Sequence, residues 1–442
     1  MSSAVKEFTG RAGQPAFAAT IVSDPVIYVA IDVAKYYHKA MIFDLNKKVL
    51  EPAFTFDISK EGFSLLLEKI SKQTDRYRTK LVVIGMEATG HYHETLAEHL
   101  RAAGFKVLLF NPYATFKTRI LEIDYVKTDE IDLKAIGQAM LLGKGREMIE
   151  EAGVYKELKL LTRFRRAKNQ ARAVLKNQML RDLDRIWPGL LKECRGKLGL
   201  FTNLWESKIA RALLKLNLLP QQVAVMSAAE LVALLKNQPV KGVGAHWANK
   251  IIKHAANVLP CAGSEAAVHQ QVTQNNLQLL ESLDNLIEEL DRKTAILLHE
   301  TPGVYLLSIQ GISTIRVAEF IAEIGNPYKY RDPKEWVKLA GLNLSRYQSG
   351  TMDRKINPIT RMGNSYLRGT LFSIARDIAR WEPLFIELKD KLCGKGKHIQ
   401  VAYGALANKF LRVAFSMMLR KSNFIPDYEN KTEKKCLTKK AA

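Results

Sequence analysis

The fold of this chain is indicated by Val26-Ile27-Tyr28-Val29-Ala30-Ile31, an apolar run that Asp32 follows directly. A run of this length and composition is typical of a strand that is buried on both faces. Two further segments, His38–Asp44 and Val49–Phe56, can pair with it as antiparallel strands, with Asn46-Lys47-Lys48 near the turn between them. The start of the chain therefore predicts a three-stranded meander.

Helices and strands alternate after the meander. In chain order the patterns predict a helix capped by Ser59, a buried strand, a helix and another strand, at about residues 60–70, 81–86, 93–103 and 105–110. A meander followed by alternating helix and strand is the order of an RNase H-like α/β domain. We therefore predict an α/β domain of this kind over residues 26–148.

The strand signals disappear after about residue 147, so the remainder of the chain is predicted to be all-α. A long, basic, amphipathic helix is expected over residues 155–186, and a second helical unit over residues 203–259. A coiled-coil-like seam follows at Leu279, Leu283, Leu286, Leu290 and Leu297.

Thr301-Pro302-Gly303 then breaks the helix and opens a last, mainly helical domain. Within it, Gln310-Gly311-Ile312-Ser313 resembles the turn of a helix-hairpin-helix, which can offer backbone N–H groups to a phosphate. The predicted division is a flexible leader, the α/β domain, a helical and coiled-coil region, a C-terminal domain and a basic tail, at residues 1–25, 26–148, 149–300, 301–425 and 426–442.

The composition favours a polyanionic partner. The 442 residues include 67 Lys and Arg against 45 Asp and Glu, a formal net charge of +22. A membrane is the weaker alternative, because no apolar run reaches the roughly 18 residues that a spanning helix needs. No signal peptide is read at the N-terminus, and the four cysteines are too far apart for a CxxC zinc motif, so we expect a cytoplasmic protein.

Four acidic residues stand out against this basic background. Asp32 and Glu87 end apolar strand segments, and Asp129 and Asp132 share one face at the start of a predicted helix. Each has an ordinary alternative, namely an exposed strand end or compensation of a helix dipole. Together they form an all-oxygen set suited to Mg²⁺ (or Mn²⁺), which can sit between carboxylates and a phosphate.

A second candidate is Ser349, which lies in Tyr347-Gln348-Ser349-Gly350-Thr351. A serine before a glycine is usually only a turn residue, and its hydroxyl is a weak nucleophile without a base or a metal. Several cations near it in the sequence could stabilise a phosphoryl transition state: Arg354, Lys355, Arg361 and Arg368. If Ser349 reacts, the four acids are the natural activator, and the two domains must meet.

The long helix offers a further set of cations, which could be only a solvated face. Because few acids interrupt it, the pattern favours contact with nucleic acid. The candidate residues are Arg163, Arg165, Arg166, Lys168, Arg172 and Lys176.

These residues resemble a known family, the DEDD-type transposases of bacterial insertion sequences (the insertion-sequence 110 family). The similar segments occur in the family's order between about residues 26 and 422: residues 31–35, 86–90, 127–132, 310–313, 322–325, 339–342, 348–350 and 361–368. The family often has Ser-Ser-Gly where this chain has Gln348-Ser349-Gly350, which points to Ser349 as the nucleophile.

The resemblance implies a RuvC-like N-terminal domain, a C-terminal transposase domain and site-specific DNA recombination. It implies that Asp32, Glu87, Asp129 and Asp132 bind Mg²⁺ and that Ser349 forms a transient phosphoserine link with DNA. It also implies donor and target DNA as partners, a structured non-coding guide RNA, homodimers that pair into tetramers in the synaptic complex, and a nucleoid-associated location.

Two rival functions remain open from the sequence. A junction-resolving nuclease would use the same acids with metal-activated water, and Ser349 would then be structural. A non-catalytic nucleic-acid-binding protein would keep the fold only as a platform.

Overall fold

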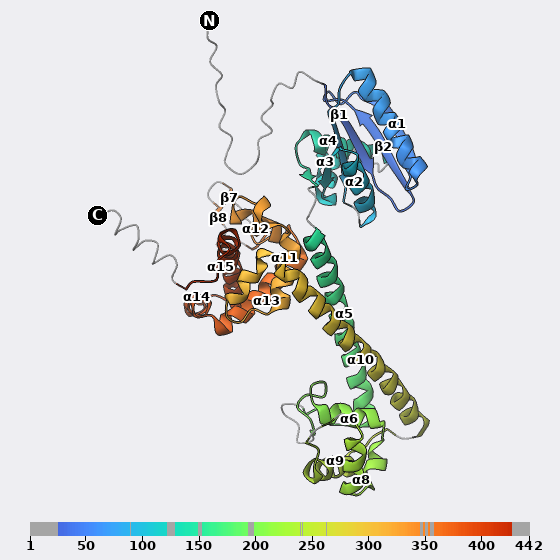
Figure 1. The fold of residues 1–442 in the computed structure, drawn as a ribbon, viewed down its shortest axis with the longest axis vertical. Helices are drawn as coiled ribbons and strands as arrows, with labels where there is room; N and C mark the ends of the chain where they lie inside the picture. Colours follow the sequence, from blue (N-terminus) through green and yellow to red (C-terminus); the bar gives the residue numbers. More distant parts are fainter. Residues whose placement is uncertain are drawn as a thin grey trace, which may run out of the picture. The chain divides into compact units, whose positions relative to one another are not determined.

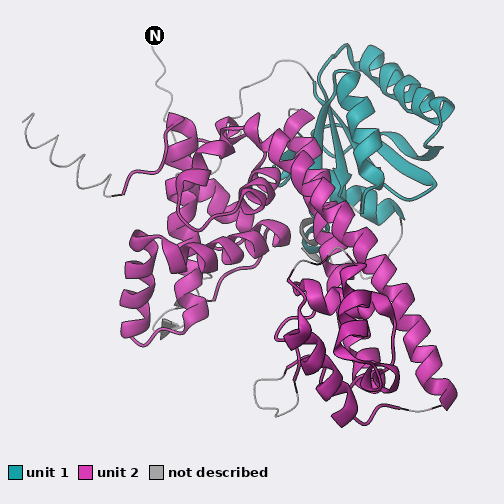
Figure 2. Ribbon diagram, turned by 60° about the horizontal axis from the view of Figure 1, so that its bottom comes forward, with its two compact units in different colours: residues 1–150 teal, residues 151–442 magenta. Residues whose placement is uncertain are grey.

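The computed structural model describes residues 25–88, 90–121, 129–148, 153–192, 199–238, 240, 242–261, 263–344, 348–349, 352–353 and 358–426. The chain forms two compact units, residues 1–150 and 151–442 (Figure 2). The predicted leader and tail fall almost wholly outside the described residues, and the predicted division near residue 300 stays a prediction.

The first unit is built on one mixed sheet with the strand order β3-β2-β1-β4-β5-β6 (Figure 1). Strands β1 to β3 form the predicted antiparallel meander, and β4 and β5 run parallel to β1. The strands are Ile27–Asp32, Tyr37–Phe43, Val49–Asp57, Val82–Glu87, Lys106–Phe110 and Arg146–Glu147. The short edge strand β6 is antiparallel to β5 and was not predicted. The RNase H-like expectation is otherwise confirmed.

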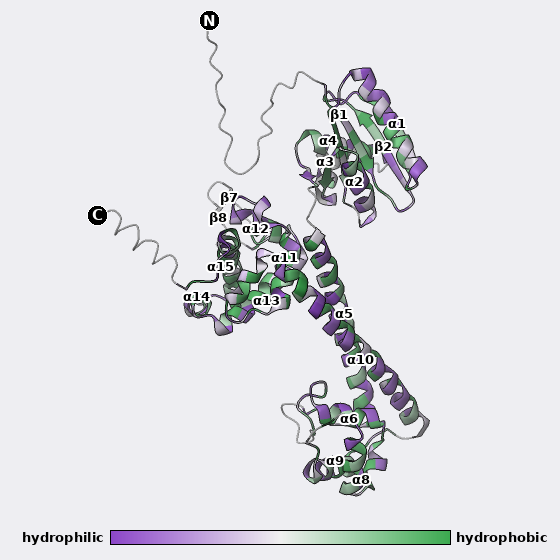
Figure 3. Cartoon of the chain, in the orientation of Figure 1, coloured by the Kyte–Doolittle hydropathy of each residue, from purple (hydrophilic) through white to green (hydrophobic). Residues whose placement is uncertain are grey.

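Helices cover both faces of this sheet, whose strands are mostly hydrophobic (Figure 3). Alternate residues of β1 enter different cores, with Ile31 on the face of α1 and α2 and Ala30 on the face of α4. The helices are α1 Lys60–Tyr77, α2 Tyr92–Ala102, α3 Pro112–Leu121 and α4 Asp129–Leu141. Helix α4 lies so close to β4 that a Cβ on Gly85 would come within 2.4 Å of the Met140 sulfur. The predicted Ser59 cap is confirmed, since its side chain accepts from the Gly62 N–H.

Two long helices, α5 (Gly153–Ile186) and α10 (Gly263–His299), pack along each other in the second unit. The predicted seam on α10 is partly wrong. Leu290 is buried as expected, but Leu279 is 56% exposed, and Leu277, Leu280 and Ile287 are buried instead. The leucines are dense enough to fit two helical phases, and packing against α5 selects one of them.

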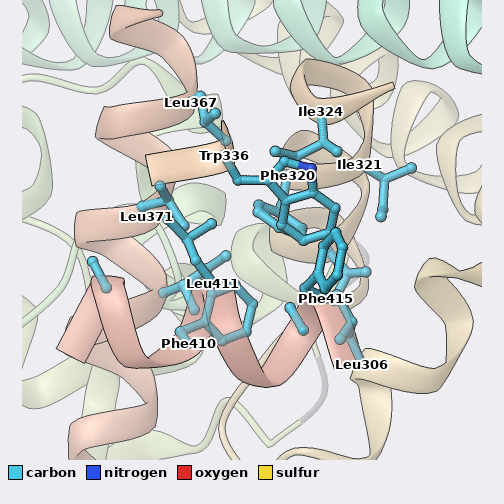
Figure 4. Packing of buried hydrophobic residues seen from close by; sticks show 14 of the residues in the cluster. Leu306, Phe320, Ile321, Ile324, Trp336, Leu367, Leu371, Phe410, Leu411 and Phe415 are labelled. Atoms are coloured by element: carbon cyan, nitrogen blue, oxygen red, sulfur yellow. The ribbon is translucent and has the colours of Figure 1, made fainter. Parts of the chain in front are cut away.

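The last part of the chain forms one helical core (Figure 4). Trp336, Phe320 and Phe410 are fully buried there, and Phe320 meets both other rings edge-on. The elements are η1 Pro302–Ser308, α11 Thr314–Ile324, η2 Pro327–Lys329, α12 Pro333–Ala340, β7 Gln348–Ser349, β8 Met352–Asp353, α13 Ser365–Trp381, α14 Pro383–Gly394 and α15 Ile399–Arg420. The predicted helix-hairpin-helix needs a correction, because its first member is the 3₁₀ helix η1.

None of the helices in the described part of the chain combines the length and apolarity needed to cross a membrane.

Candidate active site

The sheet brings Asp32 and Glu87 to the same edge. Strands β1 and β4 are parallel neighbours with Ile31 opposite Met86, and each acid is the next and last residue of its strand. Ile31 and Met86 both enter the core beneath α1 and α2. Because side chains alternate along a strand, the two acids face the opposite side, where α4 packs.

Glu87 has a partner that the sequence did not single out. Its Oε2 atom accepts a hydrogen bond of 2.6 Å from the Oγ1 of Thr115, which is buried in α3. The same hydroxyl lies 2.9 Å from the carbonyl oxygen of Pro112. Thr115 therefore orients the carboxylate of Glu87, and nothing in the local sequence pattern indicated that role.

The predicted acid pair lies on the first turn of α4, as expected. Asp129 forms an ion pair with the ammonium group of Lys39. Lys39 lies on β2 directly opposite Asp32 in the strand register. The Oδ1 atom of Asp132 is fully buried. Leu133 and Ile136 pack this helix against the sheet. The ion pair with Lys39 therefore links Asp129 to β2, the strand that neighbours β1 and its terminal residue Asp32.

The chemistry of this donor set fits a divalent cation, since all four side chains supply carboxylate oxygens, the ligands that Mg²⁺ and Mn²⁺ prefer. Among the described residues, however, no three Asp, Glu, His or Cys side chains lie close enough together to hold an ion. The Lys39 ammonium instead supplies positive charge to Asp129. A metal bound at this edge would therefore have to displace Lys39 from the carboxylate of Asp129.

The serine candidate belongs to a small hairpin in the second unit. Ser349 is the last residue of β7, which pairs with β8 so that Ser349 stands opposite Met352. The backbone of Ser349 is described, whereas its side chain is not, and Arg354 and Lys355 lie outside the described residues.

The two chain segments that lead into and out of the hairpin are joined to each other. Leu344 and Ile359 form an antiparallel bridge, and the N–H of Thr360 donates to the carbonyl of Asn343 at 2.8 Å. The N–H of Asn364 donates to the carbonyl of Leu339 at 2.7 Å. The base of the hairpin is therefore fixed over several residues on both sides.

Two predicted phosphate contacts lie in this base. Arg361 has a left-handed backbone with φ of 54°. The Nη1 atom of Arg368 donates to the carbonyl oxygens of Ala340 and Arg361 at 3.1 and 3.2 Å. Arg368 thus helps to hold the turn, and a phosphate role for either residue stays a prediction.

A charged cluster ties this base to α5. Arg163 donates two parallel hydrogen bonds, of 2.8 and 2.9 Å, to the carboxylate of Glu323 on α11. Asn364, the N-cap of α13, donates to the same carboxylate at 2.6 Å. Its own Oδ1 accepts from the N–H groups of Tyr366 and Leu367. Glu323 is therefore the link between the long helix and the segment that follows the hairpin.

The other predicted cations of α5 also have protein partners. Arg165 pairs with Asp291, and Arg172 pairs with Asp284 at 3.0 Å, both on α10. The remaining three lie over aromatic rings, with the cation 5.1, 4.7 and 5.6 Å from the ring centroid: Arg166 on Tyr366, Lys168 on Phe164 and Lys176 on Trp205. Burial lowers the pKa of Lys176, and the neighbouring Arg172 lowers it further. Contact of these residues with nucleic acid stays a prediction.

Residues 29–188 match a family model for DEDD transposases of the IS110 type, and residues 304–389 match the model described as "Transposase IS116/IS110/IS902 family". No curated protein matches.

Solved structures similar to the chain include RuvC from Thermus thermophilus in complex with a Holliday junction substrate and a second structure of RuvC from Thermus thermophilus. Both show 11% identity and a TM-score of 0.21, and both cover 28% of this chain and nearly all of RuvC (99% and 100%).

Proposed function

We propose that this chain, which belongs to the IS110 family of transposases, cuts and rejoins DNA strands through a covalent bond between Ser349 and DNA. The observation that carries the proposal is that two transposase family models match the chain. One covers the four acids of the first unit, and the other covers the helices on both sides of the β7–β8 hairpin. The acids lie in the first unit and Ser349 in the second.

The reaction is two successive displacements at phosphorus. The Oγ of Ser349 attacks a DNA phosphodiester, so an Oγ–P bond forms, the serine proton is lost and the bond from phosphorus to the leaving sugar oxygen breaks. That oxygen takes up a proton and leaves as a hydroxyl. A hydroxyl of the second strand then attacks the phosphoserine, and Ser349 regains its proton.

The four acids would hold the metal. When bound, Mg²⁺ or Mn²⁺ would neutralise phosphate charge during the displacement. Asp32 and Glu87 supply oxygens from the strand ends, and Asp129 and Asp132 supply them from α4. The hydrogen bond from Thr115 holds the carboxylate of Glu87 in one orientation. Lys39 would keep Asp129 compensated while no metal is bound.

The proposal also includes a structured non-coding RNA encoded by the same element. Base pairing of such an RNA with donor and target DNA would supply sequence selectivity. Homodimers that pair into a tetramer would bring two DNA sites together. These partners rest on the family resemblance and not on a described contact.

The test is to incubate the protein with labelled DNA, the element's RNA and Mg²⁺, and then to denature the mixture. Wild type should yield DNA attached covalently to protein, and Ser349→Ala should yield none. Ser365→Ala, a change at an exposed serine at the start of α13, is the matched control and should keep the adduct. Cleavage without an adduct would support a nuclease that uses water.

A second variant tests whether the acidic residues are needed for DNA cleavage but not for DNA binding. Asp32→Asn should abolish cleavage and leave DNA binding nearly unchanged, because it removes a ligand charge without altering side-chain size. Full activity of Asp32→Asn would instead support the non-catalytic alternative.

A further inference from the structure

Residues 199–261 form a helical module that neither family model covers, since one match ends at residue 188 and the other begins at residue 304. Its helices are α6 Lys208–Leu216, α7 Pro220–Ala224, α8 Ala228–Lys236 and α9 Ala245–Asn257 (Figure 1). Leu213, Leu231 and Ile251 are almost completely buried in a core that the module shares with α5 and α10, which contribute Met179 and Leu280. The module is therefore a well-packed part of the protein whose role does not follow from the regions that the transposase models match.

The module is basic because it contains few acids. Between residues 199 and 261 the only acidic residues are Glu206 and Glu230, and Glu230 is engaged by the Ser227 cap of α8. Two cations of the module, Arg211 and Lys215, pair with Asp284 and Glu281 of α10. The exposed lysines that form no ion pair among the described residues are Lys208, Lys236, Lys250 and Lys253.

Helix α9 gathers polar and basic side chains on one exposed face and has no acid at all. Positions spaced by three, four and seven residues share that face, and its exposed members are His246, Asn249, Lys250, Lys253 and Asn257. The Lys250 ammonium lies 4.7 Å from the centroid of the Trp247 ring, which stacks on Phe201. The aromatic pair therefore gives Lys250 a fixed support at the surface.

The second histidine of α9 points the other way. His254 accepts a hydrogen bond at Nδ1 from the indole of Trp187, and its Nε2 lies 3.1 Å from the carbonyl of Gly189. Burial lowers the pKa of His254, although the Gly189 carbonyl opposes that shift. A neutral ring satisfies both contacts, so His254 belongs to the core and the charge of α9 lies on its outer face.

The loop before α9 leaves the approach to this face open. Val243 is buried and anchors the loop, whereas a Cβ added at Gly242 or Gly244 would meet no atom within 4 Å. Gly242 has φ of +81°, which favours glycine. A phosphate backbone can thus come close to the start of α9, from which the exposed face with Lys250 and Lys253 continues along the helix.

We propose that the exposed face of α9 is a binding surface for the phosphate backbone of duplex DNA. Unpaired lysines on a face without acids complement a polyanion, and the chain belongs to a family whose substrate is DNA. The contact would be independent of sequence, and it would hold DNA outside the regions that the family models match. This proposal goes beyond the proposed chemistry and does not depend on Ser349.

The test uses the full chain and a labelled 40-base-pair duplex, without Mg²⁺, over a range of salt concentrations. Lys250→Gln/Lys253→Gln should reduce the slope of log affinity against log salt by about 2 and weaken binding roughly tenfold or more near 0.15 M salt. The matched control, Lys208→Gln/Lys236→Gln, removes the same charge from α6 and α8 and should leave most of the slope. Thermal unfolding should be unchanged in both, since all four side chains are exposed.

The proposal would be overturned if the salt slope of Lys250→Gln/Lys253→Gln were unchanged, or if both double variants lost the same slope. The same titration with an RNA hairpin of equal length gives a third test, since a loss of slope with RNA and none with duplex DNA would also overturn it. The same measurement on Ser349→Ala separates this proposal from the proposed chemistry. That variant lacks the proposed nucleophile and should form no adduct, but it should bind the duplex with the salt slope of wild type.

Discussion

Helices α5 and α9 are both basic, but they differ in how many of their cations form ion pairs. On α5, three of the six predicted nucleic-acid residues bind carboxylates of α10 or α11, and the other three lie over aromatic rings. On α9, Lys250 also lies over an aromatic ring, that of Trp247, but Lys250 and Lys253 are exposed and form no ion pair among the described residues, and no acid lies on their own helix.

A row of cations in the sequence is therefore not sufficient evidence for a surface that binds nucleic acid. The few acids within α5 suggested an open basic face, yet the compensating acids are Asp284, Asp291 and Glu323, more than a hundred residues later in the chain. Charges already paired in this way lose part of their attraction for phosphate. Three variants of α5 test this contrast with α9.

The largest effect is expected for Arg163→Ala. The Glu323 side chain is only 3% exposed, so removing Arg163 leaves a buried carboxylate with Asn364 as its remaining neutral donor. We expect the free energy of unfolding of this region to fall by about 3 kcal/mol. The midpoint of urea unfolding, followed by tryptophan fluorescence, measures the change, and the buried Trp336 is one of the five tryptophans that contribute to the signal.

The conservative variant Arg163→Lys is the control for that experiment. It keeps the charge but loses the two parallel hydrogen bonds, so it should recover only part of the stability. If Arg163→Ala instead kept its stability and lost DNA affinity, Arg163 would have to be counted, with Lys250, among the cations that contact DNA.

A smaller effect is expected for Arg172→Ala, because Asp284 keeps its second partner, Arg211. We expect a loss of about 1 kcal/mol at neutral pH, as for a partly exposed ion pair. Burial of Asp284 raises its pKa, but hydrogen bonds from Arg211 and Arg172 outweigh burial, and the pKa lies below its usual 3.8.

The pH dependence of that variant follows from the sign of the shift. A lowered carboxyl pKa stabilises the fold above pH 3.8, and the stabilisation is lost as the pH falls through the lower folded value. The stabilities of wild type and Arg172→Ala should therefore converge on acidification below about pH 4. A difference that stays constant from pH 7 to pH 3 would contradict the role of Asp284.

The smallest effect on stability is expected for Lys168→Gln. Lys168 has no ion pair among the described residues and rests on Phe164, which is itself 45% exposed. We expect a change in stability within about 0.5 kcal/mol. If Lys168 contacts DNA, its loss should reduce the salt slope by about 0.9, as for one lysine of α9. An unchanged slope would limit the open basic surface to α9.

Much of the first unit could be predicted from local pattern. The run that ends at Asp32, the Ser59 cap and the strand that ends at Glu87 each depend on neighbouring residues, so their signals are complete within a short window. The hydrogen bond from Thr115 to Glu87 could not be predicted, because it joins residues 28 positions apart on different elements. The ion pair of Lys39 with Asp129 spans 90 positions.

The second unit depended more strongly on tertiary structure. Composition indicated a basic, helical protein, but it could not choose between Leu279 and Leu280 on α10, because both phases of the helix carry leucines. It also could not show that Glu323 joins α5 to the base of the serine hairpin.

Local sequence patterns were sufficient to predict the order of the elements from β1 to β5 and the positions of the strand-end acids, since backbone propensity and side-chain alternation act over a few residues. The ion pairs could be assigned only from the folded structure, in which Arg163 is paired with Glu323 and Lys253 is exposed without an ion pair among the described residues. The physical reason is that electrostatic compensation depends on distance in space, and the folded chain brings its acids from far along the sequence.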